Sequence, residues 1–385
     1  MIRPFHLPLS LAAAAVILPL AGSPLHAQTQ PGEPRPQTTL PPAERKTELS
    51  VLWNAELGKS IVAAPAVDGQ TVFVVDQAGR LTSLNVSTGK KLWQTDLRSP
   101  ISASPLVANG VVYVGDEEGK FHAVQASSGK DRVILSAGDK IVGRAAVREG
   151  VIYVGAYDRN LYAIDAVSGK TLWSFQTQAQ VNAGPAIAAD AVLVAGCDAK
   201  VRSLDAKTGQ ERWAIDAGGP VAAALLVSDG RVFAATLKGG RVAIDPVAGK
   251  LLWQTRELPE SDGDASFSAS PVVSPISHDW IMFTAQSGAA FHHDATTGKW
   301  SKTTQIPGRL SATPVSWKGL AWAVTEEGGV YSSAKETGQW MLRFTAGAGI
   351  KASAAPAGDR LLVADEDGTV WCLVESAAKA LKPPK

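Results

Sequence analysis

A turn that recurs about every 40 residues is the feature that most constrains the fold of this chain. Its glycine stands at seven places, and the successive intervals are 40, 40, 40, 40, 49 and 40 residues. A fixed period of this size indicates a repeat architecture, in which each repeat is one supersecondary unit packed on its neighbours. The turn glycines are Gly89, Gly129, Gly169, Gly209, Gly249, Gly298 and Gly338.

Each repeat contains four short segments that favour β-strands. In the first repeat, Ile61–Val67 is small and apolar, Thr71–Val75 is β-branched, and Leu81–Val86 and Lys91–Asp96 complete the unit. Turn residues separate these segments, as expected for short strands. Eight first strands can be counted, which predicts eight four-stranded units. They begin near Ile61, Ile101, Ile141, Val181, Val221, Phe267, Leu310 and Ile350.

The two ends of the repeat region complement each other. The eighth unit lacks its fourth strand, whereas the N-terminal segment Leu49–Leu57 matches a fourth strand and has no unit of its own. Pairing the two closes a ring and removes the exposed strand edges. The sequence therefore predicts an all-β fold, an eight-bladed β-propeller over residues 48–374 whose last blade is completed by the N-terminal strand.

The repeated turn residues are expected to stabilise the blades rather than to form a site. The Asp can accept N–H groups of its own turn, and the Gly supplies a positive φ. A large flat Trp ring at one place per blade suits packing between blades. This docking set comprises Asp165, Asp205, Asp245, Gly169, Gly209, Gly249, Trp53, Trp93, Trp173, Trp213 and Trp253.

Three repeats depart from the Trp pattern. Val133 stands at the Trp position of the second repeat, and Trp300 and Trp340 fall two residues early in the sixth and seventh. A shift of two residues keeps a strand side chain on the same face. The sequence therefore predicts that Trp300 and Trp340 still pack between blades.

Polar residues in or just before the first strands are the candidates for a ligand site. Innermost strands crowd around the central axis of a propeller, so these side chains can line or rim its channel. They would form either a modest basic site for an anion or a solvated channel mouth without a ligand, and the second alternative is favoured. The residues are Arg144, Asn182, Lys351, Lys140 and Arg309.

An acidic insertion, Arg256–Ser266, breaks the repeat between the fifth and sixth units. It is either a contact for Ca²⁺ or a basic partner, or a solvated loop. Adjacent His292 and His293 point to opposite faces of a strand, so we expect no metal site there. No catalytic triad or phosphate-binding loop is present. The partner-loop candidates of the insertion are Glu257, Glu260, Asp262 and Asp264.

The N-terminal residues have the pattern of a targeting signal. Arg3 and His6 precede the apolar run Leu7–Ala21, and small residues follow up to Ala27. We expect a signal peptide over residues 1–27 cleaved near Ala27, a Pro-rich linker over 28–47 and a tail over 375–385. No transmembrane segment is predicted, and no Cys near the cut can carry a lipid. A periplasmic or secreted monomer is expected.

The charge and the cysteines restrict the partners further. The formal net charge is +1, and loss of Arg3 with the signal peptide brings it to zero. A net charge of zero gives no general electrostatic attraction to nucleic acid. Cys197 and Cys372 fall in the fourth and eighth units, on opposite sides of the predicted ring. Because a disulfide needs α-carbons within roughly 7 Å, two free thiols are expected.

The turn motif resembles a known family. Ala163–Trp173 and Ala243–Trp253 fit Ala-x-Asp-x-x-Ser/Thr-Gly-x-x-x-Trp, with Ala248 in the hydroxyl position of the second. Ser203–Trp213 and Ser83–Trp93 begin with Ser. This motif resembles the tryptophan-docking repeat of the pyrroloquinoline quinone (PQQ)-like propeller superfamily. The resemblance covers residues 49–374.

The superfamily has two relevant branches. In quinoprotein alcohol dehydrogenases, the resemblance implies PQQ in the channel, Ca²⁺ held by acidic and amide side chains, a catalytic Asp and a disulfide between adjacent cysteines. This chain has no adjacent cysteines and no Asp/Glu/Asn cluster in its predicted inner strands. The other branch is an eight-bladed, non-catalytic lipoprotein that helps insert β-barrels into the outer membrane. This chain is similar in length and layout but lacks the Cys that would carry the lipid.

The second branch gives the favoured expectation. We expect an exported, non-catalytic binding or scaffold propeller in cell-envelope or outer-membrane protein assembly, with an envelope protein as partner and no resident cofactor. The alternative is a small PQQ-dependent quinoprotein dehydrogenase that uses Ca²⁺ and oxidises an alcohol or a sugar. Fold by itself does not choose between the two branches.

Overall fold

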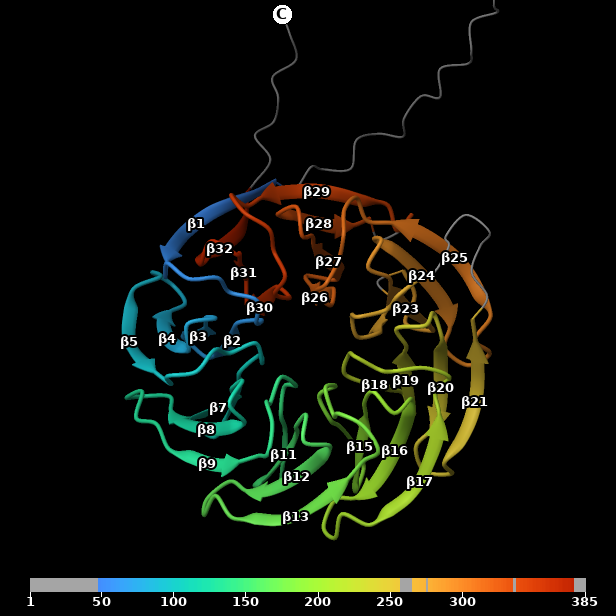
Figure 1. The fold of residues 1–385 in the computed structure, drawn as a ribbon. Helices are drawn as coiled ribbons and strands as arrows, with labels where there is room; N and C mark the ends of the chain where they lie inside the picture. The colour runs from blue at the N-terminus through green and yellow to red at the C-terminus, as the bar shows by residue number, and fades with distance from the viewer. Residues whose placement is uncertain (1–47, 257–264, 275, 335–336, 377–385) are drawn as a thin grey trace, which may run out of the picture. The chain divides into compact units, whose positions relative to one another are not determined.

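The computed structural model describes residues 48–256, 265–274, 276–334 and 337–376, all within one compact unit. These residues form eight four-stranded antiparallel sheets arranged as the blades of a ring (Figure 1). In each blade the first strand lies innermost and the fourth lies outermost. The predicted eight-bladed all-β propeller is confirmed.

The strands of the first four blades follow chain order. Blade 1 has β2 (Ala66–Asp68), β3 (Thr71–Val75), β4 (Arg80–Asn85) and β5 (Lys91–Asp96); blade 2 has β6 (Leu106–Ala108), β7 (Val111–Gly115), β8 (Lys120–Gln125) and β9 (Val133–Ser136). Blade 3 has β10 (Ala146–Arg148), β11 (Val151–Gly155), β12 (Asn160–Asp165) and β13 (Thr171–Gln176); blade 4 has β14 (Ala186–Ala188), β15 (Ala191–Ala195), β16 (Lys200–Asp205) and β17 (Glu211–Asp216).

The next three blades repeat this order, and the last one takes its fourth strand from the N-terminal end. Blade 5 has β18 (Leu226–Ser228), β19 (Arg231–Ala235), β20 (Arg241–Asp245) and β21 (Lys250–Thr255); blade 6 has β22 (Val272–Val273), β23 (Trp280–Thr284), β24 (Ala289–Asp294) and β25 (Trp300–Gln305). Blade 7 has β26 (Val315–Trp317), β27 (Leu320–Val324), β28 (Gly329–Ser333) and β29 (Trp340–Thr345); blade 8 has β30 (Ala355–Ala357), β31 (Arg360–Ala364), β32 (Thr369–Ser376) and β1 (Glu48–Glu56).

The ring closes as expected from the two complementary ends. β1 pairs antiparallel with β32, from Glu48 opposite Ser376 to Glu56 opposite Thr369. Figure 1 shows β1 in blue beside the red strands of the C-terminal end. Pairing of the two ends leaves the eighth blade without an open edge. β32 extends to Ser376, two residues beyond the predicted end of the propeller.

The innermost strands are shorter than predicted. β2 covers only Ala66–Asp68, so most of the predicted strand Ile61–Val67 lies outside the ladder. Pro65, just before β2, has no N–H group to donate to a ladder. The N–H of Ile61 instead donates to the carbonyl of Asp365 in blade 8 (3.3 Å). Ile61 is fully buried, so this segment packs between blades rather than extending the sheet.

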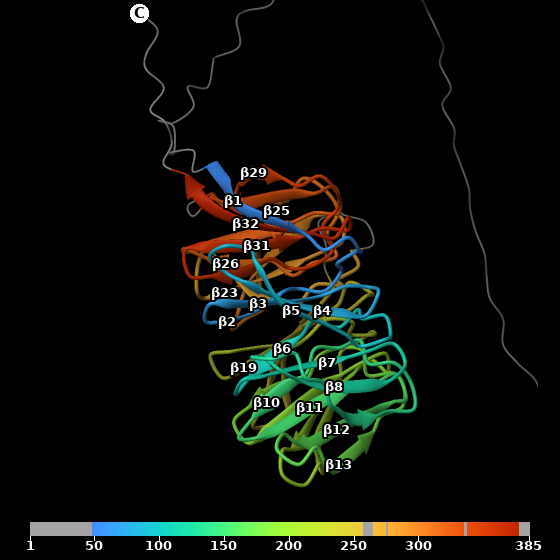
Figure 2. The ribbon, with the colours of Figure 1, turned by 90° about the vertical axis from the view of Figure 1, so that its left-hand side faces the viewer.

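The hydrophobic core is a series of layers between neighbouring blades. Phe73 and Leu81 of blade 1, for example, share one buried cluster with Val112 and Val124 of blade 2. Figure 2 shows blades 8, 1, 2 and 3 following one another in the side view. Each sheet therefore buries both faces, one against each neighbour. In the residues that the structure describes, no helix has the length and apolarity needed to cross a membrane.

Candidate functional site

The docking tryptophans of the outermost strands contact the turn of the next blade. Trp173 Nε1 donates to the carbonyl oxygen of Ala206 at 3.1 Å. Its ring lies so close to Gly209 that a Cβ there would come within 2.6 Å of it. Because Gly209 also has a φ of 72°, both the close approach and the backbone conformation require glycine. The same N–H contact is made by Trp53, Trp93, Trp213 and Trp253, at 2.8, 2.9, 3.0 and 3.1 Å.

The two-residue shift of the late tryptophans does not preserve this contact; the prediction of packing between blades is wrong for Trp300 and right for Trp340, which lies in a buried cluster of blades 6 and 7. A bulge between His292 and His293 interrupts the side-chain alternation of the pair β24–β25. Trp300 is 47% exposed, and its N–H donates to Thr303 in its own strand at 3.2 Å. Trp340 is buried and points towards the preceding blade, where its N–H donates to Thr304 of blade 6 at 3.2 Å.

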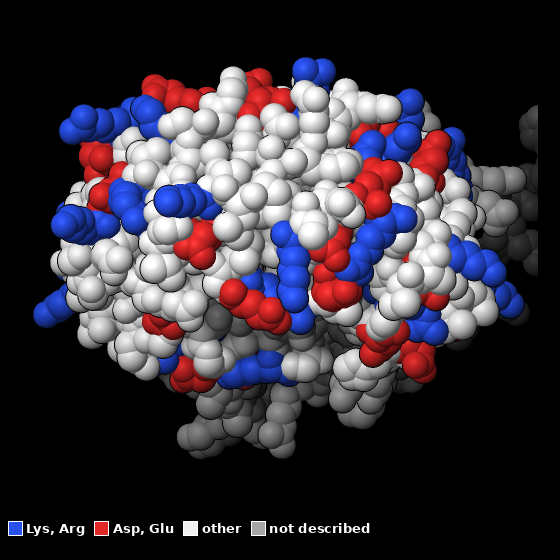
Figure 3. Space-filling model, turned by 90° about the horizontal axis from the view of Figure 1, so that it is seen from below, with Lys and Arg blue, Asp and Glu red and all other residues white. Residues whose placement is uncertain are grey.

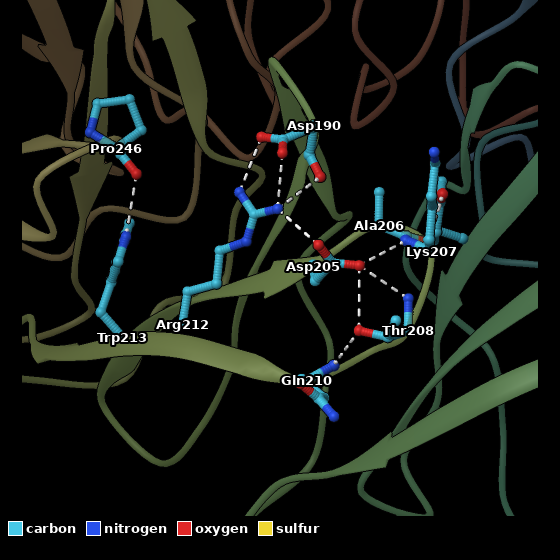
Figure 4. Close-up of polar contacts among 10 residues, drawn as sticks. Asp190, Asp205, Ala206, Lys207, Thr208, Gln210, Arg212, Trp213 and Pro246 are labelled. Carbon is cyan, nitrogen blue, oxygen red and sulfur yellow. Dashed lines mark hydrogen bonds and ion pairs between the residues drawn. The ribbon is translucent and has the colours of Figure 1, made fainter.

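The turn aspartates hydrogen-bond within their own turns. Asp205 Oδ1 accepts the N–H groups of Lys207 and Thr208 at 3.0 and 2.9 Å (Figure 4). Asp165, Asp245 and Asp294 accept turn N–H groups in the same way. Gly169, Gly209 and Gly249 have positive φ angles of 73°, 72° and 62° in these turns. The carboxylates belong to different blades, and the structure does not bring them together.

An ion-pair cluster on blade 4 gave no signal in the sequence. Arg212 Nη1 and Nη2 contact the two carboxylate oxygens of Asp190 at 2.8 and 2.7 Å, and Nη2 also contacts Asp205 Oδ2 at 2.6 Å (Figure 4). The hydrogen bond from Arg212, followed by those from Thr208, lowers the pKa of Asp205 below its usual value. Since the cluster is solvent-exposed, screening limits its contribution to stability. It links the turn of blade 4 to the loop before β15.

A cavity of about 500 Å³ lies at the centre of the ring and is lined by residues from seven blades. Its hydroxyl groups connect neighbouring blades: Ser104 accepts the N–H of Ala64, Thr313 that of Ser270, and Ser353 that of Thr313, each at 3.0 Å. The small residues of the first segments therefore let the blades approach the axis and hydrogen-bond to one another.

Of the five polar channel candidates, only Arg144 lines this cavity. Its side chain keeps an exposed surface in the cavity, yet the surrounding protein removes enough water to lower the pKa of its guanidinium. No hydrogen bond or ion pair involving the Arg144 side chain occurs among the described residues. Asn182 Oδ1 is buried and has no hydrogen-bond partner in the described part of the chain.

The other three candidates contact groups near them in the chain. Lys351 pairs with Glu366 at 2.7 Å, Arg309 lies 3.5 Å from Glu326, and the Lys140 ammonium lies 4.7 Å from the centre of the Tyr157 ring. The five residues thus do not converge on one anion. The cavity has one cationic lining residue, Arg144.

The residues of the central cavity do not fit PQQ bound through Ca²⁺. Calcium takes six to eight oxygen ligands, usually including carboxylates. The cavity lining contains no Asp or Glu. Among the residues that the structure describes, no three or more His, Cys, Asp or Glu side chains are grouped to hold a metal. The acidic candidates Glu257, Glu260, Asp262 and Asp264 lie outside the described residues.

His292 and His293 belong to different environments, as strand alternation predicts. His292 hydrogen-bonds to Ser274 and Thr304 at 2.9 and 3.2 Å, whereas His293 bonds to the Gly298 carbonyl at 2.9 Å. Burial first, and nearby positive charge second, lowers the pKa of His292 to about 4; burial also brings that of His293 to about 4. Both rings are therefore neutral near pH 7. Cys197 and Cys372 are free thiols, which confirms that prediction.

Comparisons with known proteins agree on the architecture. A family model described as outer membrane protein assembly factor BamB matches residues 47–132, 87–183 and 161–379. No curated protein sequence matches the chain. The crystal structure of BamB from Moraxella catarrhalis is similar with a TM-score of 0.71 and 19% identity, covering 85% of this chain and 99% of that one.

Two further solved structures show how widely the fold is used. The computationally designed protein Ika8 matches with a TM-score of 0.71 and 17% identity, over 86% of this chain and 100% of that one. The quinohemoprotein alcohol dehydrogenase ADHIIG from Pseudomonas putida HK5 matches with a TM-score of 0.68 and 14% identity, over 88% and 78%. At such identities the likeness shows the fold alone.

Proposed function

The chain belongs to the PQQ-like propeller family described as outer membrane protein assembly factor BamB, and from this membership we propose that it is a non-catalytic binding propeller in outer-membrane protein assembly. The observation that carries the proposal is the family match, which spans residues 47–379 and so includes every blade. The residues of the central cavity agree with it, because they form links between blades and include no acidic ligand.

The outer surface is suited to contact with a protein. Figure 3 shows basic and acidic side chains interspersed with neutral ones on the face seen from below. A cavity of about 610 Å³ between blades 3 and 4 is lined by Arg148, Tyr153, Leu172 and Lys207, among others. Leu172 is 53% exposed there. Apolar groups rimmed by mixed charges are typical of non-obligate protein interfaces.

We place this activity in the periplasm. The support is the sequence pattern of residues 1–27, where a basic start, an apolar run and small residues favour export. Those residues lie outside the described part of the chain. The partner in this proposal is an envelope protein of the assembly apparatus for β-barrels.

The test is genetic and biochemical. We expect that removing the chain from its own organism lowers the amount of folded outer-membrane β-barrel proteins, measured by heat-modifiable electrophoretic mobility. The wild-type chain, supplied back, should restore the amount. Unchanged levels of folded barrel proteins would contradict the assembly role.

The alternative dehydrogenase is tested separately with the purified protein. Reconstitution with PQQ and Ca²⁺ should give neither saturable PQQ binding nor dye-linked oxidation of alcohols or sugars. Arg144→Gln is the matched variant, because Arg144 is the single charged residue lining the central cavity. Saturable PQQ binding that Arg144→Gln removes, together with substrate oxidation, would replace the binding proposal by the enzymatic one.

A further inference from the structure

Each blade contributes one equivalent residue of its first segment to the centre of the ring, here called the axial residue. Seven of the eight axial residues line the central cavity of about 500 Å³, around which the innermost strands are arranged (Figure 1). A substitution at this position therefore changes the cavity directly. In blade order the axial residues are Ala64, Ser104, Arg144, Gly184, Ala224, Ser270, Thr313 and Ser353, and Gly184 is the one outside the lining.

Three axial hydroxyls accept the main-chain N–H of the axial residue in the preceding blade. Ser104 accepts from Ala64, Thr313 from Ser270 and Ser353 from Thr313, each at 3.0 Å. The axial N–H of one blade is thus directed at the side chain of the next blade. Such an N–H has an acceptor only where that side chain carries an oxygen.

Blades 3 and 4 interrupt this series of hydroxyls. The axial residue of blade 3 is Arg144, whose guanidinium has only donors and so cannot accept the Ser104 N–H. The axial residue of blade 4 is Gly184, which has no side chain; a Cβ there would lie 3.6 Å from the nitrogen of Arg144. Within the described ranges, no acceptor pairs with the N–H groups of Ser104, Arg144 and Gly184, nor with those of Ala224 and Ser353.

The guanidinium of Arg144 also has no counter-charge. The lining of the cavity holds no second charged residue. Burial lowers the pKa of Arg144, and no neighbouring charge contributes to that shift. Lys351, in the first segment of blade 8, differs because it pairs with Glu366 at 2.7 Å. Since partial burial of an unpaired cation costs free energy, an anion in the cavity would offset this cost.

We propose that the central cavity binds a carboxylate group, held by the Arg144 guanidinium and by the N–H groups of the axial residues beside it, Ser104 and Gly184. A guanidinium can donate two parallel hydrogen bonds to the two oxygens of a carboxylate, and main-chain N–H groups also bind this group. One negative charge balances the one positive charge, whereas a phosphate dianion would leave a charge unbalanced. The site does not depend on the proposed role in assembly.

The first experiment titrates the whole purified protein with sodium acetate and follows its backbone amide signals by NMR. The signals of Ser104, Arg144 and Gly184 should shift saturably, with a dissociation constant on the order of millimolar for so small a ligand. The ionic strength is held constant with sodium chloride, so that screening does not change during the titration. Inorganic phosphate should bind more weakly than acetate.

Variants then locate the site. Arg144→Ser should fold, because Ser is the axial residue of blades 2, 6 and 8. It should weaken acetate binding at least about tenfold through loss of the charged donors. Arg144→Lys keeps the charge but not the paired donors, and should weaken binding about three- to tenfold. Lys351→Gln is the matched control: it also removes one positive charge from a first segment, but outside the cavity lining, and should leave binding unchanged.

Thermal denaturation gives a second readout. Acetate should raise the thermal midpoint of the wild-type protein and of Lys351→Gln, because a ligand of the folded state stabilises it, and should not raise that of Arg144→Ser. Without acetate, Arg144→Ser should have a midpoint at least as high as the wild-type protein, since it removes an unpaired cation. A clear loss of stability in this variant would mean that Arg144 supports the fold and not a ligand.

Two peptides identify the source of the carboxylate. Acetyl-Ala-Asp-Ala-amide presents the group as a protein side chain would, and acetyl-Ala-Asn-Ala-amide is its neutral counterpart and should not bind. Tighter binding of the Asp peptide than of acetate assigns the site to an acidic side chain of a protein. Binding of acetate without binding of the peptide assigns it to a free carboxylate ion.

Three results would overturn the proposal. The first is the absence of a saturable shift at the three amides, or equal binding of acetate by Arg144→Ser. The second is an equal loss of binding in Lys351→Gln, which would reduce the effect to general electrostatic attraction. The third is tighter binding of phosphate than of acetate. Each is measured on the purified protein and not on barrel-protein levels, so failure of this site and failure of the assembly role are distinguishable.

Discussion

The contact between the outermost strand of one blade and the turn of the next blade is here called a joint. Joints with a docking tryptophan and joints without one make the same two contacts through different residues. In five joints a single Trp both covers the glycine of the next turn and donates to a carbonyl there. Between blades 2 and 3, Ile134 covers Gly169 while Arg132 donates to Val167. Two side chains together replace one indole.

The joint between blades 6 and 7 follows the same rule. Ile276 packs against Gly338, and Lys302, at the residue position of the Trp, donates to the Thr337 carbonyl at 2.6 Å. A rigid ring fixes the two contacts relative to each other, whereas two flexible side chains do not. We infer that the joints of the second kind are weaker, and the predictions below test this difference from the largest effect to the smallest.

Deletion of β1 should have the largest effect. Without Glu48–Glu56, blade 8 loses its outer strand and the joint to blade 1 loses Trp53. We expect aggregation, or a fall in the thermal midpoint large enough to leave little folded protein, because an open blade edge is exposed. Size-exclusion chromatography and thermal denaturation measure this. The control is a truncation that removes residues 1–47 and keeps β1. A stable, monomeric protein without β1 would show that closure of the ring by β1 does not contribute to stability.

Truncation of a docking indole should cost more than truncation of an exposed one. Trp173→Ala is expected to lower the free energy of unfolding by about 3 kcal/mol, in the range for truncation of packed aromatic residues. Trp300→Ala, at an exposed position, should change it by less than about 0.5 kcal/mol. Chemical denaturation measures both values. Equal effects would mean that Trp173 contributes no more than a surface ring.

Acid should affect the contributions of two buried histidines in opposite directions. His293 lies in the Trp253 joint, with ring centres 6.1 Å apart, and its pKa is lowered to about 4. In the unfolded chain a His has a pKa of about 6.5, so above that pH the depressed pKa of His293 costs no stability. As the pH falls from 6.5 towards 4, protonation favours the unfolded chain and the free energy of unfolding decreases. At pH 4.5 the loss is roughly 2–3 kcal/mol for such a residue.

His122, which hydrogen-bonds to Asp131 and Asp116 of its own blade 2, has the opposite sign. Burial alone would lower its pKa, but hydrogen bonds and charges of Asp131 and Asp116 outweigh it and raise the pKa. Its contribution is fully present below about pH 6.5 and is lost as the pH rises through the folded value. Hydrogen exchange at pH 5 and pH 7, corrected for intrinsic rates, should show the Trp253 joint opening more easily at pH 5. His293→Gln should reduce that difference, whereas His122→Gln should not.

Removal of the cationic donor from a joint without Trp should have a moderate effect. Lys302→Met keeps the aliphatic chain but loses the contact with Thr337, so we expect about 1 kcal/mol of destabilisation. Lys299→Met is the control, because Lys299 is exposed and directly precedes β25; this change should leave the stability unaltered. A neutral Lys302→Met would show that the donor contributes nothing to this joint.

Restoring the motif in the second repeat should have the smallest effect. Val133→Trp recreates the repeat spacing, but in the present register Val133 is exposed, so the stability change should stay within about 0.5 kcal/mol. Ile134→Trp should stabilise more, because Ile134 faces Gly169. Thermal denaturation of the two variants compares them, and a larger gain for Val133→Trp would mean that the bulge moves to the register of the other blades.

Most of the fold could be predicted from the sequence because the repeat carries local chemistry. The intervals between turn glycines, the Asp–Gly turn and the spare N-terminal strand gave the number of blades and their closure. The inner strands were predicted too long, because a run of small residues ending in Pro65 resembles a strand although it packs without a ladder. Five polar residues were expected to line or rim the central channel, yet only Arg144 lines the cavity there.

The sequence by itself determined the repeat, the residues of each turn and the family, since these depend on spacing and on backbone conformations that only Gly or Asp favours. Only the tertiary structure decided which side chains meet across a joint. A bulge in β8–β9 places Ile134 over Gly169, and a separate bulge in β24–β25 leaves Trp300 exposed. A bulge changes side-chain alternation without a mark in the repeat spacing, because it arises from the fit of one blade against the next.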